Sequence, residues 1–499
     1  MKFLYPLLLG GLLLAGCQQN SKPDAAGAGA TTGLAGASTD TAFVITFSSL
    51  PPAELAAGAT PKQLAEFAWA EFLALNWQSN YDTIRKQRDA PDPNWNYHDP
   101  SPKLTVWETY AHRTELQPAN DSIRPFNSAP RYSYGEQIKR ARKGVSFSLF
   151  NNLDENSEIG SCNLYGQVTS SPQQMVLYQA KVNSNEYNYI LKRYPKQGSL
   201  GLAIKTNIAN IKKYKAYYDT TAAKNKKYKG NCYCPPGVLC LPCGNDTLKT
   251  RQGIGTIEVK TAWRQLNANE DASKFLTRNV VYYRQKAGND TLFYDNATFA
   301  LIGMHIIHKT VNYPDFVFAT FEHKDVEKDK MGFRLILQNK QKQDSLSALH
   351  YPYQRLHPLT KVDSLATVAA HRKIKAMNRN SVLLNYRLVG VQGTPTSNTS
   401  TPNFFLANYV VESDSLLANF HGSGFAHPHD QKPNILLKGK LLSAGGCQGC
   451  HGVAQQKFGT DFSFLLGGTT MAPDIDETQQ QKLIRYIRAT TIAAAKRKK

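Results

Sequence analysis

The chain has 499 residues, a formal net charge of +21 and 41% hydrophobic residues, among them 22 Phe, 25 Tyr and 5 Trp. This length allows two or three domains, or one large domain with a small appendage, and the aromatic content allows a sizeable core. No nucleic-acid recognition motif accompanies the positive charge, and no phosphate loop, dinucleotide fingerprint or nucleophile triad is visible. DNA or RNA binding and the corresponding enzyme classes are therefore disfavoured.

Residues 1–16 read as an export signal, with Lys2 followed by an apolar run. A run this short cannot span a membrane, which takes roughly 20 residues. Leu14-Ala15-Gly16-Cys17 has the form of a lipobox. We expect cleavage before Cys17 and acylation of that cysteine, with an ordinary signal peptide as the alternative. The expected location is the cell envelope, lipid-anchored in the outer membrane and facing the periplasm or the cell surface.

Residues 17–41 are rich in Ala, Gly, Ser and Thr and predict a flexible tether. Folded structure is expected from residue 42. For an exported basic protein, the favoured partners are anionic lipid, surface polysaccharide or an acidic redox protein.

The sequence indicates helices at three places in the main domain. Thr60 can cap a helix over 61–77, with Pro61 in its first turn and Gln63 as a capping-box partner. A shorter helix is expected over 185–193, and a further helix is possible over 402–420.

Most of the region 42–435 predicts strands, because its apolar runs are β-branched or aromatic and near strand length. These runs cover 145–150, 175–182, 254–262, 280–284, 299–308, 316–323, 332–337 and 382–391. The expected fold class is α+β, with a largely antiparallel β-rich main domain and a short α-helical segment at 436–499.

Four cysteines lie within twelve residues of a Pro/Gly-rich stretch: Cys232, Cys234, Cys240 and Cys243. They could form two disulfides, a tetrathiolate zinc site or an iron–sulfur site. Export to an oxidising compartment and the tight Cys-x-Cys spacing favour disulfides. Cys162 is left over as a thiol.

A hairpin is predicted from the strands 299–308 and 316–323. A symmetric register pairs His305 with Thr320 and places Glu322 on the same face, one diagonal away. His305 and Glu322 are then either a functional pair (general base, metal ligand or haem-facing group) or a buried histidine bonded to a carboxylate. His308 and His323 share the opposite face, far apart.

The strongest motif is Cys447-Gln448-Gly449-Cys450-His451. Cys-x-x-Cys-His is the attachment signature of c-type haem, in which two thiols bond the porphyrin vinyl groups and the histidine ligates iron. A disulfide or thiol pair that happens to precede a histidine is the alternative.

Through this motif, the residues from about 439 onward resemble a short monohaem cytochrome c domain. The whole chain is similar to a group of exported bacterial cytochrome c family proteins with no established reaction. The similar phrases are 107–109, 257–260, 303–310, 320–323 and 385–390. The resemblance implies one covalent haem c and does not imply a substrate.

The sixth iron ligand stays open. Met471 resembles the distal methionine of cytochromes c, although it is close to His451 in sequence. A histidine from elsewhere, including His421, His427 and His429, or an open site are the alternatives. A terminal helix is expected from about 474 to 495.

Two classes of function fit these features. The first is an electron carrier, and a six-coordinate iron spectrum would favour it. The second is a haem-dependent oxidoreductase with a substrate site in the large domain. An iron that is accessible to added ligands would favour this second class. A surface binding module would also explain the nearly 400 residues beyond a haem domain. Electron transfer is the function that we expect.

Overall fold

The computed structural model contains two compact units, Met1–Ala42 and Phe43–Lys499. It describes residues 42–116 without 83, 122–130, 150, 165–166, 176–213 without 197, 239–244, 251–285 without 267–269, 292–325, 334–335, 359–396, six positions in 401–411, 435–437, 440–442, 445–454 and 459–466. Several predicted features lie outside these residues: the signal segment and tether, Cys17, Cys162, Cys232, Cys234, the three histidines of 421–429, Met471 and the terminal helix.

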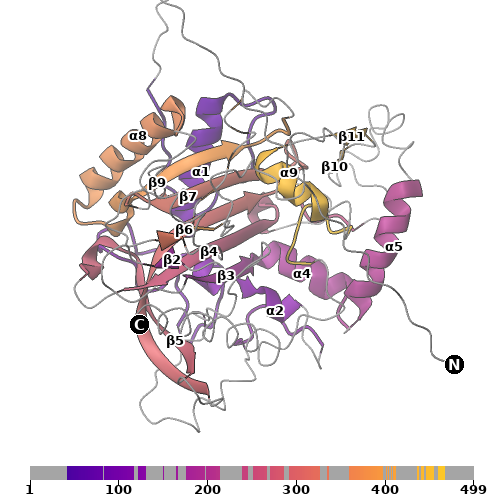
Figure 1. Ribbon diagram of the computed structural model, residues 1–499, viewed down its shortest axis with the longest axis horizontal. Helices are drawn as coiled ribbons and strands as arrows, with labels where there is room; N and C mark the ends of the chain where they lie inside the picture. Colours follow the sequence, from indigo (N-terminus) through magenta and orange to yellow (C-terminus); the bar gives the residue numbers. More distant parts are fainter. Residues whose placement is uncertain are drawn as a thin grey trace, which may run out of the picture. The chain divides into compact units, whose positions relative to one another are not determined.

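A seven-stranded antiparallel sheet forms the centre of the second unit (Figure 1). Its order is β1-β3-β4-β6-β7-β9, and β5 pairs with β6 beside this path. The strands are β1 (Ala111–His112), β3 (Val176–Val182), β4 (Ile257–Gln265), β5 (Thr277–Gln285), β6 (Leu292–His308), β7 (Val317–His323) and β9 (Tyr386–Gln392). Two short pairs stand apart, β2 (Tyr165–Gly166) with β8 (Arg334–Leu335) and β10 (Ile435–Leu437) with β11 (Lys440–Leu442).

The α-helices of the described residues complete a mixed α+β fold, so the predicted fold class is confirmed. They are α1 (Pro61–Leu75), α2 (Arg113–Leu116), α4 (Ser184–Arg193), α5 (Ser199–Lys213), α8 (Lys361–Met377) and α9 (Gly446–Val453). Across the described residues, none of the helices is both long enough and apolar enough to cross a membrane.

Local capping explains where α1 begins. The hydroxyl of Thr60 accepts a hydrogen bond from the backbone N–H of Gln63, and the Gln63 side chain accepts one from the Thr60 N–H. The predicted capping box is thus confirmed. The helix ends before Asn76, whose backbone N–H and side-chain amide both donate to the Phe72 carbonyl.

The predicted strand at 382–391 is wrong in its first half. Val382–Asn385 form a 3₁₀ turn (η6), because the Ser381 hydroxyl accepts a hydrogen bond from the Leu383 N–H and starts a helical turn there. β9 begins only at Tyr386. No α-helix covers those residues of 402–420 that the structure describes, and α5 and α8 were not predicted.

The two faces of the sheet carry two different cores. One core contains α1 and α8 packed on apolar side chains that include Met304, Ile306 and Phe321. The second core lies on the opposite face and includes Ile307 and Phe318, with Phe462 and Leu466 from the C-terminal part of the chain. The second face is therefore where the C-terminal segment meets the sheet.

Buried charge also holds the N-terminal part of this unit together. The fully buried guanidinium of Arg88 donates to both Glu115 carboxylate oxygens at 2.8 and 2.9 Å and to the carbonyls of Thr109, Tyr110 and Phe126 at 2.7–2.9 Å. Removing one member of such a network leaves the other charge buried without compensation.

We expect Arg88→Ala to lower the free energy of unfolding by about 3–5 kcal/mol, because the Glu115 carboxylate loses its positive partner and four backbone carbonyls lose the guanidinium as a donor. The matched Arg85→Ala removes an exposed arginine paired with Asp82 at 3.6 Å and should cost less than about 1 kcal/mol. Urea denaturation measures both. Equal costs would contradict a structural role for Arg88.

Candidate functional site

The Cys-x-x-Cys-His motif lies on α9, a helix that starts after the N-cap residue Gly445. Cys447, Cys450 and His451 occupy positions i, i+3 and i+4, so they share one face of this helix. Cys450 is buried, whereas Cys447 and His451 are half-buried. The structure thus brings the three predicted haem-binding residues together on one side of a single turn and a half of helix.

Hydrogen bonds from Gln448 dock α9 on the sheet. The buried side-chain amide of Gln448 donates to the backbone carbonyls of Asp315, Phe316 and Gly393 at 3.0–3.3 Å. Its backbone N–H donates to Oε1 of Gln392 at 2.9 Å, and the Gln392 amide donates to the Gly445 carbonyl at 3.2 Å. The end of β9 and the loop before β7 therefore fix the helix in place.

Gly446 allows this close approach. Its φ is +70°, and a Cβ at this position would lie 2.2 Å from the Asn403 carbonyl oxygen and 2.6 Å from Oε1 of Gln392. Any side chain would push α9 away from β9.

His451 has a defined orientation. Its Nδ1 lies 2.7 Å from the carbonyl oxygen of Phe462, and since a carbonyl only accepts, Nδ1 carries the proton and donates. The ring packs against Phe318 of β7 and Phe464, with centroids 4.9 and 5.0 Å away. Nε2 is consequently the nitrogen that holds the lone pair.

The segment 459–466, which supplies the Phe462 carbonyl, has an unusual backbone. Gly459, Asp461 and Phe462 all have positive φ, at 66°, 53° and 67°. For a residue as bulky as Phe this conformation is strained, and such strain persists only where the surroundings impose it.

An ion pair and an amide supply that constraint. Lys309, at the end of β6, forms a buried ion pair with Oδ2 of Asp461, and the Leu241 N–H donates to the same oxygen at 2.6 Å. The Asn207 amide of α5 donates to the Gly459 carbonyl. Burial raises the pKa of Asp461, and the charge of Lys309 opposes this shift.

Part of the cysteine cluster adjoins this segment. Cys240 and Cys243 are both disulfide-bonded, which agrees with the favoured alternative for these two residues. The Nζ atom of Lys309 lies 3.7 Å from Sγ of Cys240, and Leu241 between the two cysteines contacts Asp461. The cysteine-rich loop thus helps to support the segment that orients His451.

A further buried carboxylate, that of Glu186, interacts electrostatically with the Lys309–Asp461 pair. Glu186 of α4 is fully buried, and both of its carboxylate oxygens lack a hydrogen-bond donor. Its pKa is raised well above the usual value by burial first and then by the negative charges of Glu258 and Asp461. Across the described residues, no three His, Cys, Asp or Glu side chains are arranged to hold a metal ion.

The predicted hairpin register is confirmed. His305 of β6 pairs with Thr320 of β7, and Gly303 pairs with Glu322, one diagonal from His305. Glu322 has a partner that was not predicted, because Arg387 of β9 donates to its Oε1 at 2.7 and 3.0 Å. A functional role for His305 and Glu322 as a pair stays a prediction.

The other two histidines of this hairpin, His308 and His323, lie on the face of the sheet that packs against α1 and α8. Nδ1 of His308 lies 2.7 Å from the buried Glu71 of α1. His323 stacks on Phe275 with centroids 4.2 Å apart, accepts from the Asp325 N–H and donates to the Lys274 carbonyl. Burial lowers the pKa of His323 to about 4.

Sequence reasoning missed the residues that position His451. Lys309, Asn207, Phe318 and Gln392 come from four different elements and are 59 to 244 positions away from it in sequence, so no local pattern identifies them. Only the sequence 459–462, with a glycine before a polar pair, indicates a turn.

Gly446→Ala should undock α9. The matched Gly58→Ala has the same φ of +70° but nothing within 4 Å of its Cβ. It should therefore lower the free energy of unfolding only by the cost of the backbone conformation, about 1–2 kcal/mol. In Gly446→Ala the clash should lower the free energy of unfolding by a further amount of about 1–3 kcal/mol. Hydrogen–deuterium exchange should show lost protection in 446–453 for Gly446→Ala alone. Protection equal to wild type would disprove this docking.

The stability should depend on pH through His323. Because its folded pKa of about 4 lies below the unfolded value of about 6.5, the unfolded state binds more protons between these two pH values. The contribution of His323 to the free energy of unfolding is therefore fully present above about pH 6.5. As the pH falls toward 4, the free energy of unfolding drops by about 3 kcal/mol. His323→Gln should flatten this dependence in urea denaturation, whereas the exposed His98→Gln should leave it unchanged. An unchanged slope in His323→Gln would contradict the assignment.

No family model, no curated protein and no solved structure matches this chain. The chemistry of the site therefore rests on its own residues.

Proposed function

We propose that this chain is an exported, lipid-anchored c-type cytochrome that holds one covalent haem on α9 and transfers electrons. The proposal starts from the Cys447-x-x-Cys450-His451 motif. What carries it is the hydrogen bond from Nδ1 of His451 to the Phe462 carbonyl at 2.7 Å.

Histidines that ligate a metal usually donate their other ring N–H to a backbone carbonyl or a carboxylate, which fixes the tautomer and the ring plane. His451 has this arrangement, with the lone pair on Nε2. A histidine that merely follows a disulfide or thiol pair has no need for a strained segment to supply its acceptor. The residues present therefore fit a haem whose iron is held by His451.

Each residue has a role in this proposal. Cys447 and Cys450 would bind the porphyrin as thioethers, and Nε2 of His451 would ligate the iron. Phe318 and Phe464 would keep water from the imidazole and the Phe462 carbonyl would hold its proton at Nδ1. A haem bound there would supply an iron that accepts and returns one electron.

The remaining elements of the proposal come from the sequence. Met471 is our candidate for the second side chain that would ligate the iron. Acyl chains on Cys17 would keep the protein at the surface of the outer membrane, and the net charge of +21 suits an acidic redox partner.

The test is an absorption spectrum of the exported protein, reduced in alkaline pyridine. We expect a c-type haemochrome band in the wild-type protein and in the control His98→Ala, and its complete loss in Cys447→Ala/Cys450→Ala. His451→Ala should keep covalent haem, because both cysteines remain, but change the spectrum of the native protein, because the histidine that would ligate the iron is gone.

A wild-type protein without this band, made in a host with cytochrome maturation, would refute the haem. A band that survives the double cysteine variant would refute the attachment site.

A further inference from the structure

A second site lies away from α9, at the other end of β9. A pocket of about 580 Å³ is lined by residues of α8, of η6 and of the turn after β7, among them Lys324, His371, Lys375, Leu384 and Asn385. Asn385 directly precedes β9, whereas Gln392 at the other end of β9 holds α9. Seven strand residues span roughly 20 Å, so the two sites are separate.

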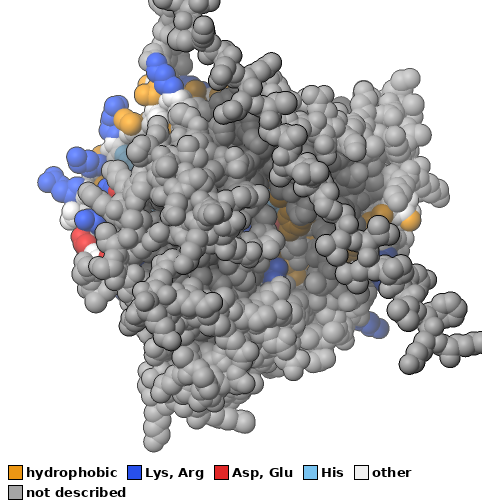
Figure 2. Space-filling view, in the orientation of Figure 1, with side chains coloured by type: hydrophobic (Ala, Val, Ile, Leu, Met, Phe, Trp, Pro, Cys, Tyr) orange, Lys and Arg blue, Asp and Glu red, His pale blue; other side chains and the backbone are white. Residues whose placement is uncertain are grey.

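The lining is strongly basic. It contains four cations, Lys324, Arg372, Lys375 and Arg379, and no acidic residue. Within the part of the chain that the structure describes, no carboxylate forms an ion pair with the side chains of these four cations. In the space-filling view, Lys and Arg side chains gather over α8, with hydrophobic side chains between them (Figure 2).

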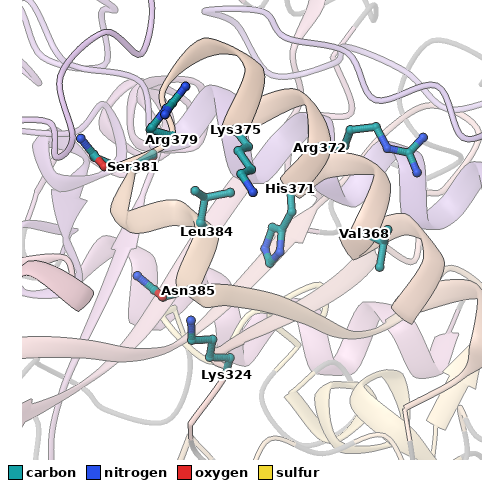
Figure 3. Close-up of a pocket in the computed structure, with 10 residues that line it drawn as sticks. Lys324, Val368, His371, Arg372, Lys375, Arg379, Ser381, Leu384 and Asn385 are labelled. Atoms are coloured by element: carbon teal, nitrogen blue, oxygen red, sulfur yellow. The ribbon is translucent and has the colours of Figure 1, made fainter.

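Figure 3 shows how these groups are placed. Lys375 and His371 extend from α8 into the space beside Leu384, and Lys324, which follows β7, extends toward Asn385. Arg372 and Arg379 lie at opposite ends of the group in this view, and their guanidinium groups point away from its centre. Lys375, His371 and Lys324 therefore face the space beside the apolar Leu384, and the two arginines lie at its rim.

The C-terminus of α8 does not account for this charge. The end of a helix carries about half a negative charge, against four positive side chains. The four cations are exposed and line one pocket. Water and salt screen their mutual repulsion, and an anion bound among them would reduce it further.

We propose that this pocket binds a phosphate-bearing ligand with at least two negative charges. The arginine guanidinium matches the oxygens of a phosphate group in a bidentate fashion, and lysine serves as a point charge beside it. Asn380, Ser381 and Asn385 offer uncharged polar groups. The volume lies within the range of pockets for organic ligands, and Leu384 and Val368 suit an organic body beside the phosphate.

The ligand could be a soluble phosphorylated compound or the headgroup of a phospholipid. The exposed side chains of Leu365 and Val368 on α8 would lie beside the acyl part of the latter. Both sources share the chemistry that the pocket recognises, and the experiment separates them.

His371 offers a readout at the site itself. Its Nε2–H donates to the Tyr386 carbonyl at 2.7 Å. Burial and the charge of Lys324 lower its pKa, while the hydrogen bond to Tyr386 opposes them. A bound dianion would offset the charge of Lys324 and raise this pKa.

The experiment is calorimetric titration of the full chain with inorganic pyrophosphate. We expect saturable binding that weakens at least tenfold in Lys375→Ala/Arg379→Ala. The control Lys103→Ala/Arg85→Ala removes the same charge from exposed positions outside the pocket and should bind like the wild type. NMR of ¹³C-labelled histidine, assigned with His371→Gln, should show the pKa of His371 rising with pyrophosphate.

Competition identifies the source. Short-chain phosphatidylglycerol that displaces pyrophosphate, where phosphatidylcholine does not, indicates a lipid headgroup; pyrophosphate binding without this competition indicates a soluble ligand. Both results support the proposal. Absence of saturable pyrophosphate binding, equal losses in the two double variants, or tighter binding of citrate would overturn it. Because the pocket lies apart from α9, the outcome does not depend on haem.

Discussion

The pairing of β6 with β7 determines which side chains lie on each face of the central sheet. His305 faces Thr320 and Ile307 faces Phe318, so these residues share the face that meets α9, whereas His308 turns toward α1. Side chains alternate with period two, so a slip of β7 by one residue against β6 would turn the side chains of β7 to the other face. Phe318 would then leave the ring of His451. The orientation of His451 thus depends on the register of a hairpin far from it in sequence.

Within the described residues, the C-terminal segment has no core of its own. Cys447 packs against the core shared by α4, β3 and β7, and Phe462 and Leu466 belong to that core. The amide of Gln448 reaches main-chain carbonyls of the large domain. In the proposed function, the large domain therefore provides the packing that a small cytochrome would have to build from its own helices, which accounts for part of the mass beyond a haem-binding segment.

Sequence reasoning succeeded where the determinants are local. The Thr60–Gln63 box starts α1, and two apolar strands paired symmetrically across the loop between them were enough for the β6–β7 register. The same rule could have found α8, because Thr360 caps it through the Asp363 N–H three positions later. The partners of the site could not be found this way. Asp461 meets Lys309 across 152 positions, and Glu322 meets Arg387 only because β9 happens to lie next to β7.

β9 is the end strand of the sheet, and its outer backbone needs partners. α8 supplies them: the Leu388 N–H donates to the Thr367 hydroxyl, and Nε2–H of His371 donates to the Tyr386 carbonyl. Neutral and protonated histidine both keep this N–H, since protonation adds a proton to Nδ1. The charge of His371 can therefore change when an anion enters the basic pocket without loss of the bond that protects the edge. A phosphate-bearing ligand would then bind at one end of β9 while Gln392, at the other end, keeps α9 in place.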